Sequence, residues 1–164
     1  MSRSYEKARL INLAFFVTVL YMKIQIITTG SPNLAFAKQG ITEYTKRLSR
    51  FVDLSVIHVK ENKDTDTKII KTIGNDVCIL FDEEGKEYTS RQFAKLIDKK
   101  KIQGLNISFI IGGPDGHTDV IRERADMSVS LSQLTFPHDI AMMLSLESIY
   151  RAYTINAGHP YHRD

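Results

Sequence analysis

The stretch ISFIIGGPDG, residues 107–116, decides the fold class of this chain. Four of its first five residues are apolar, with Ser108 the exception, which is typical of a central parallel strand that is buried on both faces. The run passes directly into a glycine-rich turn, where the backbone can bend sharply. A second apolar run, VCILF at residues 77–81, has the same character. Two such strands indicate an α/β protein built on a parallel sheet.

Outward from these two strands, the sequence alternates regularly between strand and helix. Further strands are predicted at 23–28, 53–59 and 127–131 from their β-branched and apolar residues. Apolar residues at helical spacing predict helices at 34–51, 67–73, 90–103, 119–126 and 138–155. Residues 82–86 are predicted to form a polar turn, and Asn33 is expected to cap the first helix. The alternation predicts an α/β fold, a parallel sheet with helices on both faces.

The composition limits what the chain can be. Its 164 residues suit one domain, and 43% hydrophobic with 25% charged residues is ordinary for a globular protein. Most of the net charge of +3 falls in the first residues, so bulk charge does not indicate a nucleic-acid binder. The single cysteine, Cys78, excludes a disulfide within the chain and fits a reduced, cytoplasmic protein.

Any RNA contact would therefore need a local cluster of basic residues. The candidates are Lys46–Arg47–Arg50, Lys99–Lys100–Lys101, and Arg151 with Arg163. For the bases of the first predicted helix, a solvated helix face is the simpler interpretation.

Residues 1–21 differ in character from the rest of the chain. A basic start and the apolar run LINLAFFVTVLY are similar to a signal peptide, and Ala35-Phe36-Ala37 is similar to a cleavage site. However, the run is too short to span a bilayer, and cleavage there would remove the strand at 23–28. We therefore favour a misassigned start over a targeting segment. The predicted organisation is an extension at 1–21 followed by a single domain at 22–164.

Three predicted strand ends carry residues suited to a ligand. In open α/β sheets, ligands bind beyond the carboxyl ends of strands, and glycines let the backbone approach closely. The three ends are Phe81-Asp82, the turn at 112–116 and the loop Ser132-Gln133-Leu134-Thr135-Phe136-Pro137. Their backbone groups could hydrogen-bond an adenine or a ribose. The glycine turn alone is equally consistent with a tight strand-to-helix connection.

Several common site motifs are absent from the sequence. There is no G-x-G-x-x-G, no phosphate loop, no G-x-S-x-G elbow and no H-E-x-x-H. The single cysteine and the scattered histidines do not have the spacing of metal ligands, so we predict no metal site.

The last predicted helix and the tail concentrate charged and proton-carrying groups. Glu147 and Arg151 are spaced i,i+4 on an otherwise apolar helix, so we expect them to be partly buried and paired. An apolar face left over would suit a homodimer interface. The tail GHPYHRD, residues 158–164, is rich in groups that bind phosphate or move protons. A disordered polar tail is the alternative, and His138 is also consistent with a capping or packing role.

Taken together, these segments resemble one family. FIIGGPDG, SLSQLTFPH and LESIYRAYTINAGHPYHRD are similar to the ribosomal RNA large subunit methyltransferase H family, of the SPOUT class. MKIQIITTG and GITEYTKRL also match the family's opening. The resemblance covers Met22 to Asp164 and is most specific in the Tyr-Arg-Ala helix and the closing Tyr-His-Arg. The family's start coincides with Met22, which favours the misassigned start.

The resemblance implies a fold, a cofactor and a reaction. It implies a parallel-sheet SPOUT fold with a C-terminal trefoil knot, and a homodimer with S-adenosylmethionine (SAM) bound near the subunit interface. The implied reaction is methylation of N3 of pseudouridine 1915 in helix 69 of 23S rRNA, within the assembled ribosome in the cytoplasm, without a metal or a membrane. The alternatives are a non-enzymatic SAM-binding module and an RNA-binding protein without a cofactor, which a SAM titration would distinguish.

The family's functional positions fall on two groups of residues in this chain. The SAM site would use Phe81, Asp82, Gly113, Ser132, Gln133, Leu134, Thr135, Phe136 and Pro137. The catalytic or RNA-contacting positions would fall on His138, Glu147, Arg151, Tyr161, His162 and Arg163. His162 would accept the N3 proton, and the arginines would stabilise negative charge or bind phosphate. One departure is Met142, where many members have an arginine. If that arginine contacts RNA in the relatives, another basic residue would have to make the contact in this chain.

Overall fold

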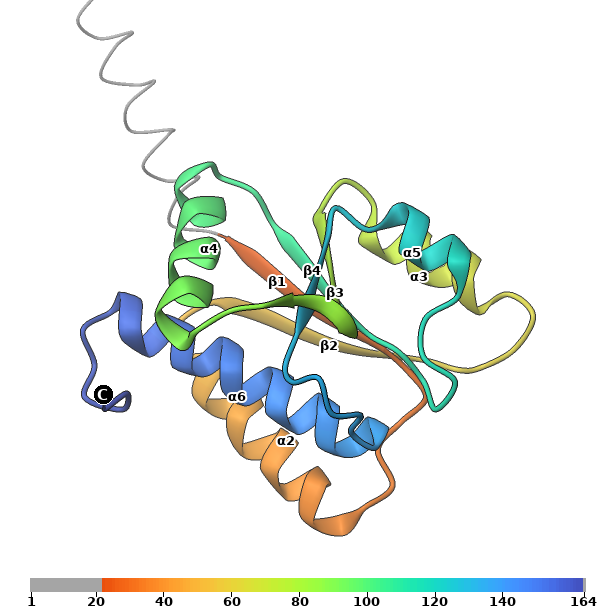
Figure 1. Cartoon of the computed structure of the whole chain (residues 1–164), viewed down its shortest axis with the longest axis horizontal. Helices are drawn as coiled ribbons and strands as arrows, with labels where there is room; N and C mark the ends of the chain where they lie inside the picture. The colour runs from red at the N-terminus through yellow and green to blue at the C-terminus, as the bar shows by residue number, and fades with distance from the viewer. Residues whose placement is uncertain (1–21, 164) are drawn as a thin grey trace, which may run out of the picture.

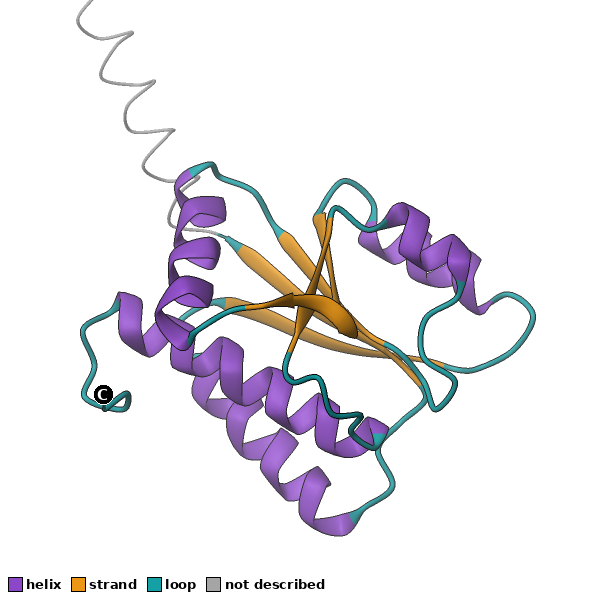
Figure 2. Ribbon diagram, viewed as in Figure 1, coloured by secondary structure: helices purple, strands orange, loops and turns teal. Residues whose placement is uncertain are grey.

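The computed structural model describes residues 22–163, so the predicted extension at 1–21 lies outside the described residues. Strands and helices alternate along the chain (Figure 1, Figure 2). The strands are β1 (Lys23–Thr29), β2 (Asp53–Val59), β3 (Val77–Glu87), β4 (Ile107–Ile111) and β5 (Met127–Ser130). The helices are α2 (Ala35–Leu48), α3 (Thr65–Ile73), α4 (Ser90–Ile102), α5 (Asp119–Arg124) and α6 (His138–Asn156). Across residues 22–163, no helix combines the length and the apolar character needed to cross a membrane.

The strands form one five-stranded sheet in the order β2-β1-β4-β3-β5, and every neighbouring pair is parallel. The two apolar runs that predicted the fold are the central strands, with Ile79 directly opposite Phe109. Parallel neighbours need crossover connections, and the helices supply them. The predicted α/β fold with a parallel sheet is therefore confirmed.

Alternate residues of the central strands pack on opposite faces of the sheet. Phe81 and Phe109 stack at a centroid distance of 5.5 Å on the face covered by α2, α4 and α6 (Figure 1). Leu80 and Ile110 point to the other face, where α3 and α5 cover them. Helices thus cover both faces of the sheet, so a ligand site is expected at the carboxyl ends of the strands.

Strand β3 continues to Glu87, so the prediction of a polar turn at 82–86 is wrong. Beyond an irregularity after Phe81, the strand pairs again with β5 through Lys86 opposite Val129. Gly85 makes this possible, because a Cβ there would lie 2.7 Å from the backbone nitrogen of Val129. The prediction failed because residues 82–86 are polar. The second half of β3 is stabilised by backbone pairing with β5 and not by the burial of apolar side chains.

The amino end of α2 is held by a residue that lies far away in the sequence. Leu34 occupies the N-cap position without a side-chain cap, so the expected cap by Asn33 is wrong. The buried carboxylate of Asp139, in the first turn of α6, instead accepts the backbone N–H groups of Asn33 and Leu34, each at 2.6 Å. Burial by itself would raise the pKa of Asp139, but these two donors, with His138 and Lys38, lower it below its ordinary value.

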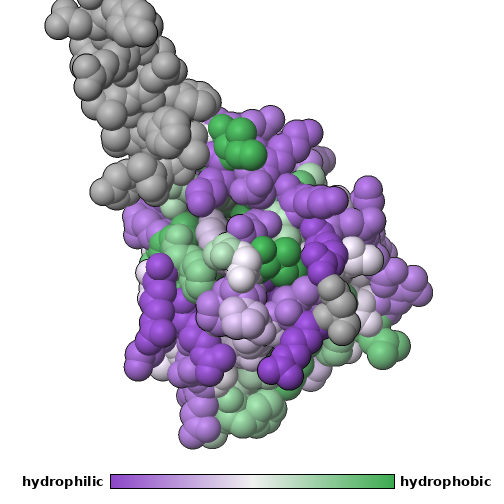
Figure 3. Space-filling model, turned by 90° about the vertical axis from the view of Figure 1, so that its left-hand side faces the viewer, coloured by the Kyte–Doolittle hydropathy of each residue, from purple (hydrophilic) through white to green (hydrophobic). Residues whose placement is uncertain are grey.

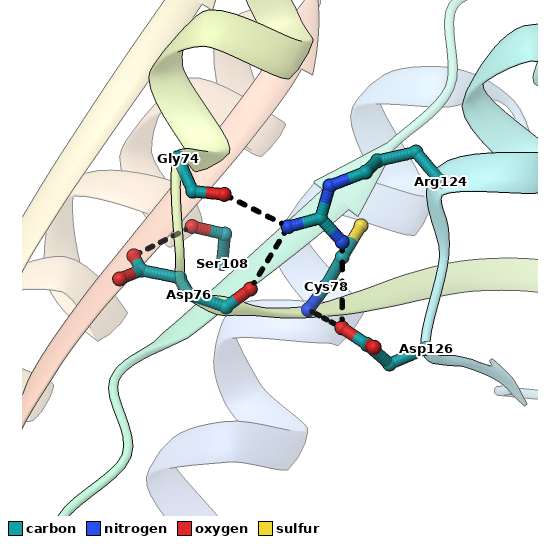
Figure 4. A network of polar contacts seen from close by, with 6 residues as sticks. All are labelled: Gly74, Asp76, Cys78, Ser108, Arg124 and Asp126. Carbon is teal, nitrogen blue, oxygen red and sulfur yellow. Dashed lines mark hydrogen bonds and ion pairs between the residues drawn. The ribbon is translucent and has the colours of Figure 1, made fainter.

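A polar network ties β3, β4 and the segment before β5 together at the amino edge of the sheet (Figure 4). Arg124 donates to the carbonyl oxygens of Gly74 and Asp76 at 2.9 and 3.2 Å. The backbone N–H of Cys78 donates to the carboxylate of Asp126 at 2.7 Å. Burial raises the pKa of the Cys78 thiol to about 11, so this cysteine has a structural and not a nucleophilic role.

Candidate active site

A cavity of about 770 Å³ opens at the carboxyl ends of β3, β4 and β5, beside the start of α6. All three predicted strand ends contribute to it. Of the residues predicted for the cofactor, the lining includes Phe81, Asp82, Gly113, Ser132, Leu134, Thr135, Phe136 and Pro137. Gln133 is exposed and does not line it, whereas His138 does. The structure thus brings together groups that are more than fifty residues apart in the sequence.

The glycine turn forms one wall of the cavity, and its conformation requires glycine at two positions. A Cβ on Gly112 would lie 2.7 Å from the carbonyl carbon of Gly116, and Gly116 itself has a φ of +77°. The turn is closed by the N–H of Gly116, which donates to the carbonyl of Gly113 at 3.0 Å. The glycines therefore bring bare backbone to the cavity, which suits close approach by a ligand.

Asp82 is held within the protein. Its side chain is 3% exposed and forms an ion pair with Arg122, while the N–H of Glu84 donates to its second oxygen at 3.0 Å. Next to it, Glu83 accepts a hydrogen bond from the hydroxyl of Thr135 and links β3 to the loop at 132–137. Asp82 therefore fixes the end of the cavity wall, and the backbone beside it faces the cavity.

Two histidines lie at the cavity. Nε2 of His117 donates to the carbonyl of Phe81 at 2.9 Å, and burial lowers the pKa of His117, which keeps the ring neutral. Nδ1 of His138 is 2.7 Å from the carbonyl of Gly112, which can only accept, so this nitrogen carries a proton. Nε2 of His138 is buried and has no hydrogen-bond partner among residues 22–163. His138 was predicted with the catalytic group, and the structure places it at the cavity lined by the residues predicted for the cofactor.

The predicted substrate residues Glu147, Arg151, Tyr161 and His162 form a second cluster. Glu147 and Arg151 form an ion pair with side chains 17% and 30% exposed, which confirms the predicted pairing and partial burial. The Tyr161 hydroxyl donates to Oε1 of Glu147 at 3.0 Å. The Arg151 guanidinium lies 4.9 Å from the centre of the Tyr161 ring and 3.3 Å from Nδ1 of His162. We call these four residues the tail cluster.

Helix α2 contributes a tyrosine that the sequence did not single out. The hydroxyls of Tyr44 and Tyr161 are 3.3 Å apart, and the ring of Tyr150 meets that of Tyr161 edge-on at 4.8 Å. Burial, together with the bonds to Tyr44 and Glu147, raises the pKa of Tyr161 well above its ordinary value. In the sequence, Tyr44 had the spacing of a core position, and nothing local indicated that it meets the tail.

The cavity lies at the start of α6, whereas the tail cluster lies along its middle and carboxyl-terminal part. His138 and Arg151 are thirteen residues apart on this helix, which is about 20 Å along its axis. The last described residue, Arg163, is exposed. Met142, the departure from the family pattern, is fully buried between α6 and the sheet, so it has a packing role. One chain therefore does not bring its tail cluster to its own cavity.

Metal coordination has no supporting cluster in the described part of the chain. No group of three or more His, Cys, Asp or Glu side chains within residues 22–163 is arranged to hold an ion.

Comparisons with known proteins agree in sequence and in fold. A family model described as "Predicted SPOUT methyltransferase" matches residues 22–162. A ribosomal RNA large subunit methyltransferase H from Deinococcus radiodurans is 43% identical over 145 residues, which cover 87% of this chain and 99% of that protein. Proteins of the same name from Thermus thermophilus and Streptococcus pneumoniae are 34% and 36% identical, each over 87% of this chain, and the matches cover 99% and 100% of those proteins.

Solved structures are similar at a much lower sequence identity. A "Probable Methyltransferase" from Bordetella pertussis Tohama I has a TM-score of 0.53 at 10% identity, and the match covers 83% of this chain and 98% of that chain. A "probable methylase family protein" from Haemophilus influenzae Rd KW20 has a TM-score of 0.53 at 8% identity, covering 88% of this chain and 72% of that one. At these identities the likeness concerns the fold alone.

Proposed function

This chain belongs to the SPOUT methyltransferase family, together with the ribosomal RNA large subunit methyltransferases H, and we propose that it methylates 23S rRNA with SAM as the donor. The target that we propose is N3 of pseudouridine 1915 in helix 69, modified within the assembled ribosome in the cytoplasm. The observation that carries the proposal is a glycine-walled cavity at the strand ends, combined with a separate cluster of proton-carrying and cationic side chains.

The cavity has the properties that SAM requires. Its wall at Gly112 and Gly116 is bare backbone, whose turn a Cβ on Gly112 would disrupt, and its loop at 132–137 is tied to β3 through Thr135 and Glu83. The buried Nε2 of His138 has no partner within the described chain, which a ligand group could satisfy. SAM supplies an activated methyl group when bound. The neutral His117 ring adds no charge of its own beside Phe81.

We further propose that the active protein is a homodimer in which the tail cluster of one protomer serves the cavity of the other. The separation of about 20 Å along α6 supports this, because one chain keeps the two groups apart. Helix α6 also keeps apolar side chains only half-buried at Ile140, Met143 and Leu144, and Leu34 and Phe36 at the start of α2 are 43% and 56% exposed. These residues offer apolar surface for a second copy. The family's trefoil knot remains part of this proposal.

The tail cluster can remove a proton and stabilise the resulting charge. N3 of pseudouridine is an imide nitrogen that carries a proton, so its methylation needs a base or an anion stabiliser. Arg151 always donates, so Nδ1 of His162 accepts from it in this arrangement. When a phosphate or the developing anion draws Arg151 away, Nδ1 can accept the N3 proton in its place. Glu147 orients Arg151, and Tyr161 packs against the guanidinium face. We assign the exposed Arg163 to the binding of phosphate or of the anion.

The test is complementation between two defective variants of the purified protein. His162→Ala removes the proposed base, and Gly112→Ala disrupts the glycine turn of the cavity. Each homodimer is expected to be inactive on ribosomes that lack the methyl group, and mixed dimers are expected to regain up to about half of the activity at one of their two sites. If His162→Ala and Arg163→Ala both leave methylation intact while SAM binding is normal, the tail has no catalytic role. If mixing restores nothing although mixed dimers form, the shared site is wrong.

A further inference from the structure

The carboxyl end of α2 carries three basic residues that border the tail cluster. Lys46, Arg47 and Arg50 lie in the last turn of α2 and the turn after it. The guanidinium of Arg47 is 6.0 Å from the centre of the Tyr150 ring, and Tyr150 in turn packs against Tyr161 at 4.8 Å. Only one aromatic side chain therefore separates the basic end of α2 from the tail.

Two of these cations have no ionic partner among the described residues. Arg47 is paired with Glu43, its neighbour one turn earlier, at 2.6 Å. Lys46 and Arg50 are exposed, and no ion pair involves either of them within residues 22–163. Lys46 lies in the last turn of α2 and Arg50 in the turn that follows it, so both lie at the carboxyl end of this helix with Arg47. They form a small positive surface next to the proposed catalytic groups.

The other basic candidate, at the end of α4, lies elsewhere. Lys99, Lys100 and Lys101 occupy the last turn of α4, which leads into the amino end of β4. In Figure 1 this end of α4 is turned away from the carboxyl terminus of the chain. Figure 3 views the molecule from the side of α4 and the tail, and most of that face is hydrophilic, with smaller hydrophobic groups in between. Charge alone does not separate the two basic clusters, but the link from Arg47 through Tyr150 to Tyr161 does.

We propose that Lys46 and Arg50 bind backbone phosphates of the RNA whose base is held at the tail cluster, an inference that rests on the proposed function. Exposed lysines and arginines are the groups that contact phosphate, and such contacts fix the register of a protein on nucleic acid. Arg47 is held between Glu43 and the tyrosine rings, so it shapes this surface and its charge is partly neutralised. The surface extends the substrate site of a protein whose overall charge is close to neutral.

The experiment compares two double variants that remove the same charge. Lys46→Gln with Arg50→Gln alters the proposed surface. Lys95→Gln with Lys99→Gln is the matched control, because these cations are also exposed and four residues apart, on α4. Methylation of ribosomes that lack the methyl group is measured with the dimeric protein from roughly 50 to 200 mM salt. SAM binding and the midpoint of thermal unfolding are measured for every variant.

Each lost phosphate contact should reduce the salt dependence of ribosome binding by a similar amount, so the number of lost contacts can be measured. The slope of log KM against log salt is expected to fall by about 0.7 to 0.9 per cation removed. At ~0.1 M salt the KM for ribosomes should rise by at least about fivefold, whereas kcat and the Kd for SAM stay within about twofold. The control should match the wild type. A KM and slope equal to those of the control would overturn the inference while the proposed function stands. A wild-type protein that methylates no ribosomes would instead overturn the proposed function.

Discussion

The hydroxyl of Tyr161 donates a hydrogen bond to the carboxylate of Glu147, with 3.0 Å between the two oxygens. The same carboxylate oxygen accepts from Arg151, so one acidic side chain on α6 fixes both the tail and the guanidinium. The tail is therefore a structured element of the protein. Its groups are arranged before any substrate arrives, which is what positioning by an enzyme requires.

Replacing Glu147 should disrupt catalysis more than folding. Glu147→Gln removes the charge that holds Arg151, so we expect kcat on ribosomes to fall by about 10- to 100-fold, the factor that corresponds to a lost hydrogen bond to a charged group. The Kd for SAM should stay unchanged because the cavity lies at the start of α6. Glu123→Gln, an exposed position on α5, is the control. Equal kcat values for the two variants would contradict this role of Glu147.

Tyr161 should act by position and not by ionisation. Its raised pKa, caused mainly by burial, keeps the phenol protonated throughout the assay range. Tyr161→Phe should therefore lower kcat by about two- to tenfold and leave the shape of the pH–rate profile unchanged. His162→Ala should change that shape, because it removes the proposed base. A profile that changes with Tyr161→Phe and not with His162→Ala would reverse the two roles.

Disrupting the glycine turn should weaken cofactor binding. A methyl group at Gly112 would meet Gly116 at 2.7 Å, so Gly112→Ala should weaken SAM binding by at least about tenfold. Gly74→Ala is the control for backbone strain alone, because Gly74 has a φ of +54°, which L side chains rarely adopt, and lies in open space away from the cavity. Calorimetric titration with SAM measures both, alongside their unfolding midpoints. Wild-type SAM affinity in Gly112→Ala would place the cofactor elsewhere.

Asp139 should stabilise the fold in a pH-dependent manner. Asp139→Ala leaves the N–H groups of Asn33 and Leu34 without an acceptor, so at pH 7 we expect a loss of about 1 to 3 kcal/mol in the free energy of unfolding. Because the pKa of Asp139 is lowered in the folded protein, its contribution is complete above the ordinary aspartate value of about 3.9 and disappears as the pH falls through the lowered value. Urea unfolding at neutral and strongly acidic pH measures this difference. A difference that grows on acidification would contradict the assignment.

Local pattern was enough to predict the fold class and the cavity. The apolar runs at 77–81 and 107–111 became adjacent central strands, because a run buried on both faces has few alternatives. The strand-end residues then met at one edge, because parallel strands all end on the same side. Family resemblance was needed for the reaction, the target base and the assembly.

Long-range polar contacts could not be predicted from local pattern. The pairing of Asp139 with the start of α2 spans 105 residues, and that of Tyr44 with Tyr161 spans 117. No spacing rule joins positions so far apart. The continuation of β3 past Asp82 could not be predicted either. A glycine among polar residues indicates a turn, and Gly85 is needed here because the backbone of Val129 lies against it. The assignment of His138 to the catalytic or RNA-contacting group came from the family resemblance and stays a prediction, while the structure adds that His138 lines the cavity.

The most direct test of the account is reverse transcription across helix 69 of 23S rRNA from a strain in which the gene for this chain has been deleted. An N3-methyl group blocks base pairing, so reverse transcriptase stops at it. The account predicts that the stop is present in the parent strain, absent from the deletion strain, and restored by the wild-type chain but not by a chain carrying His162→Ala. A stop that persists unchanged in the deletion strain would contradict the proposed methylation.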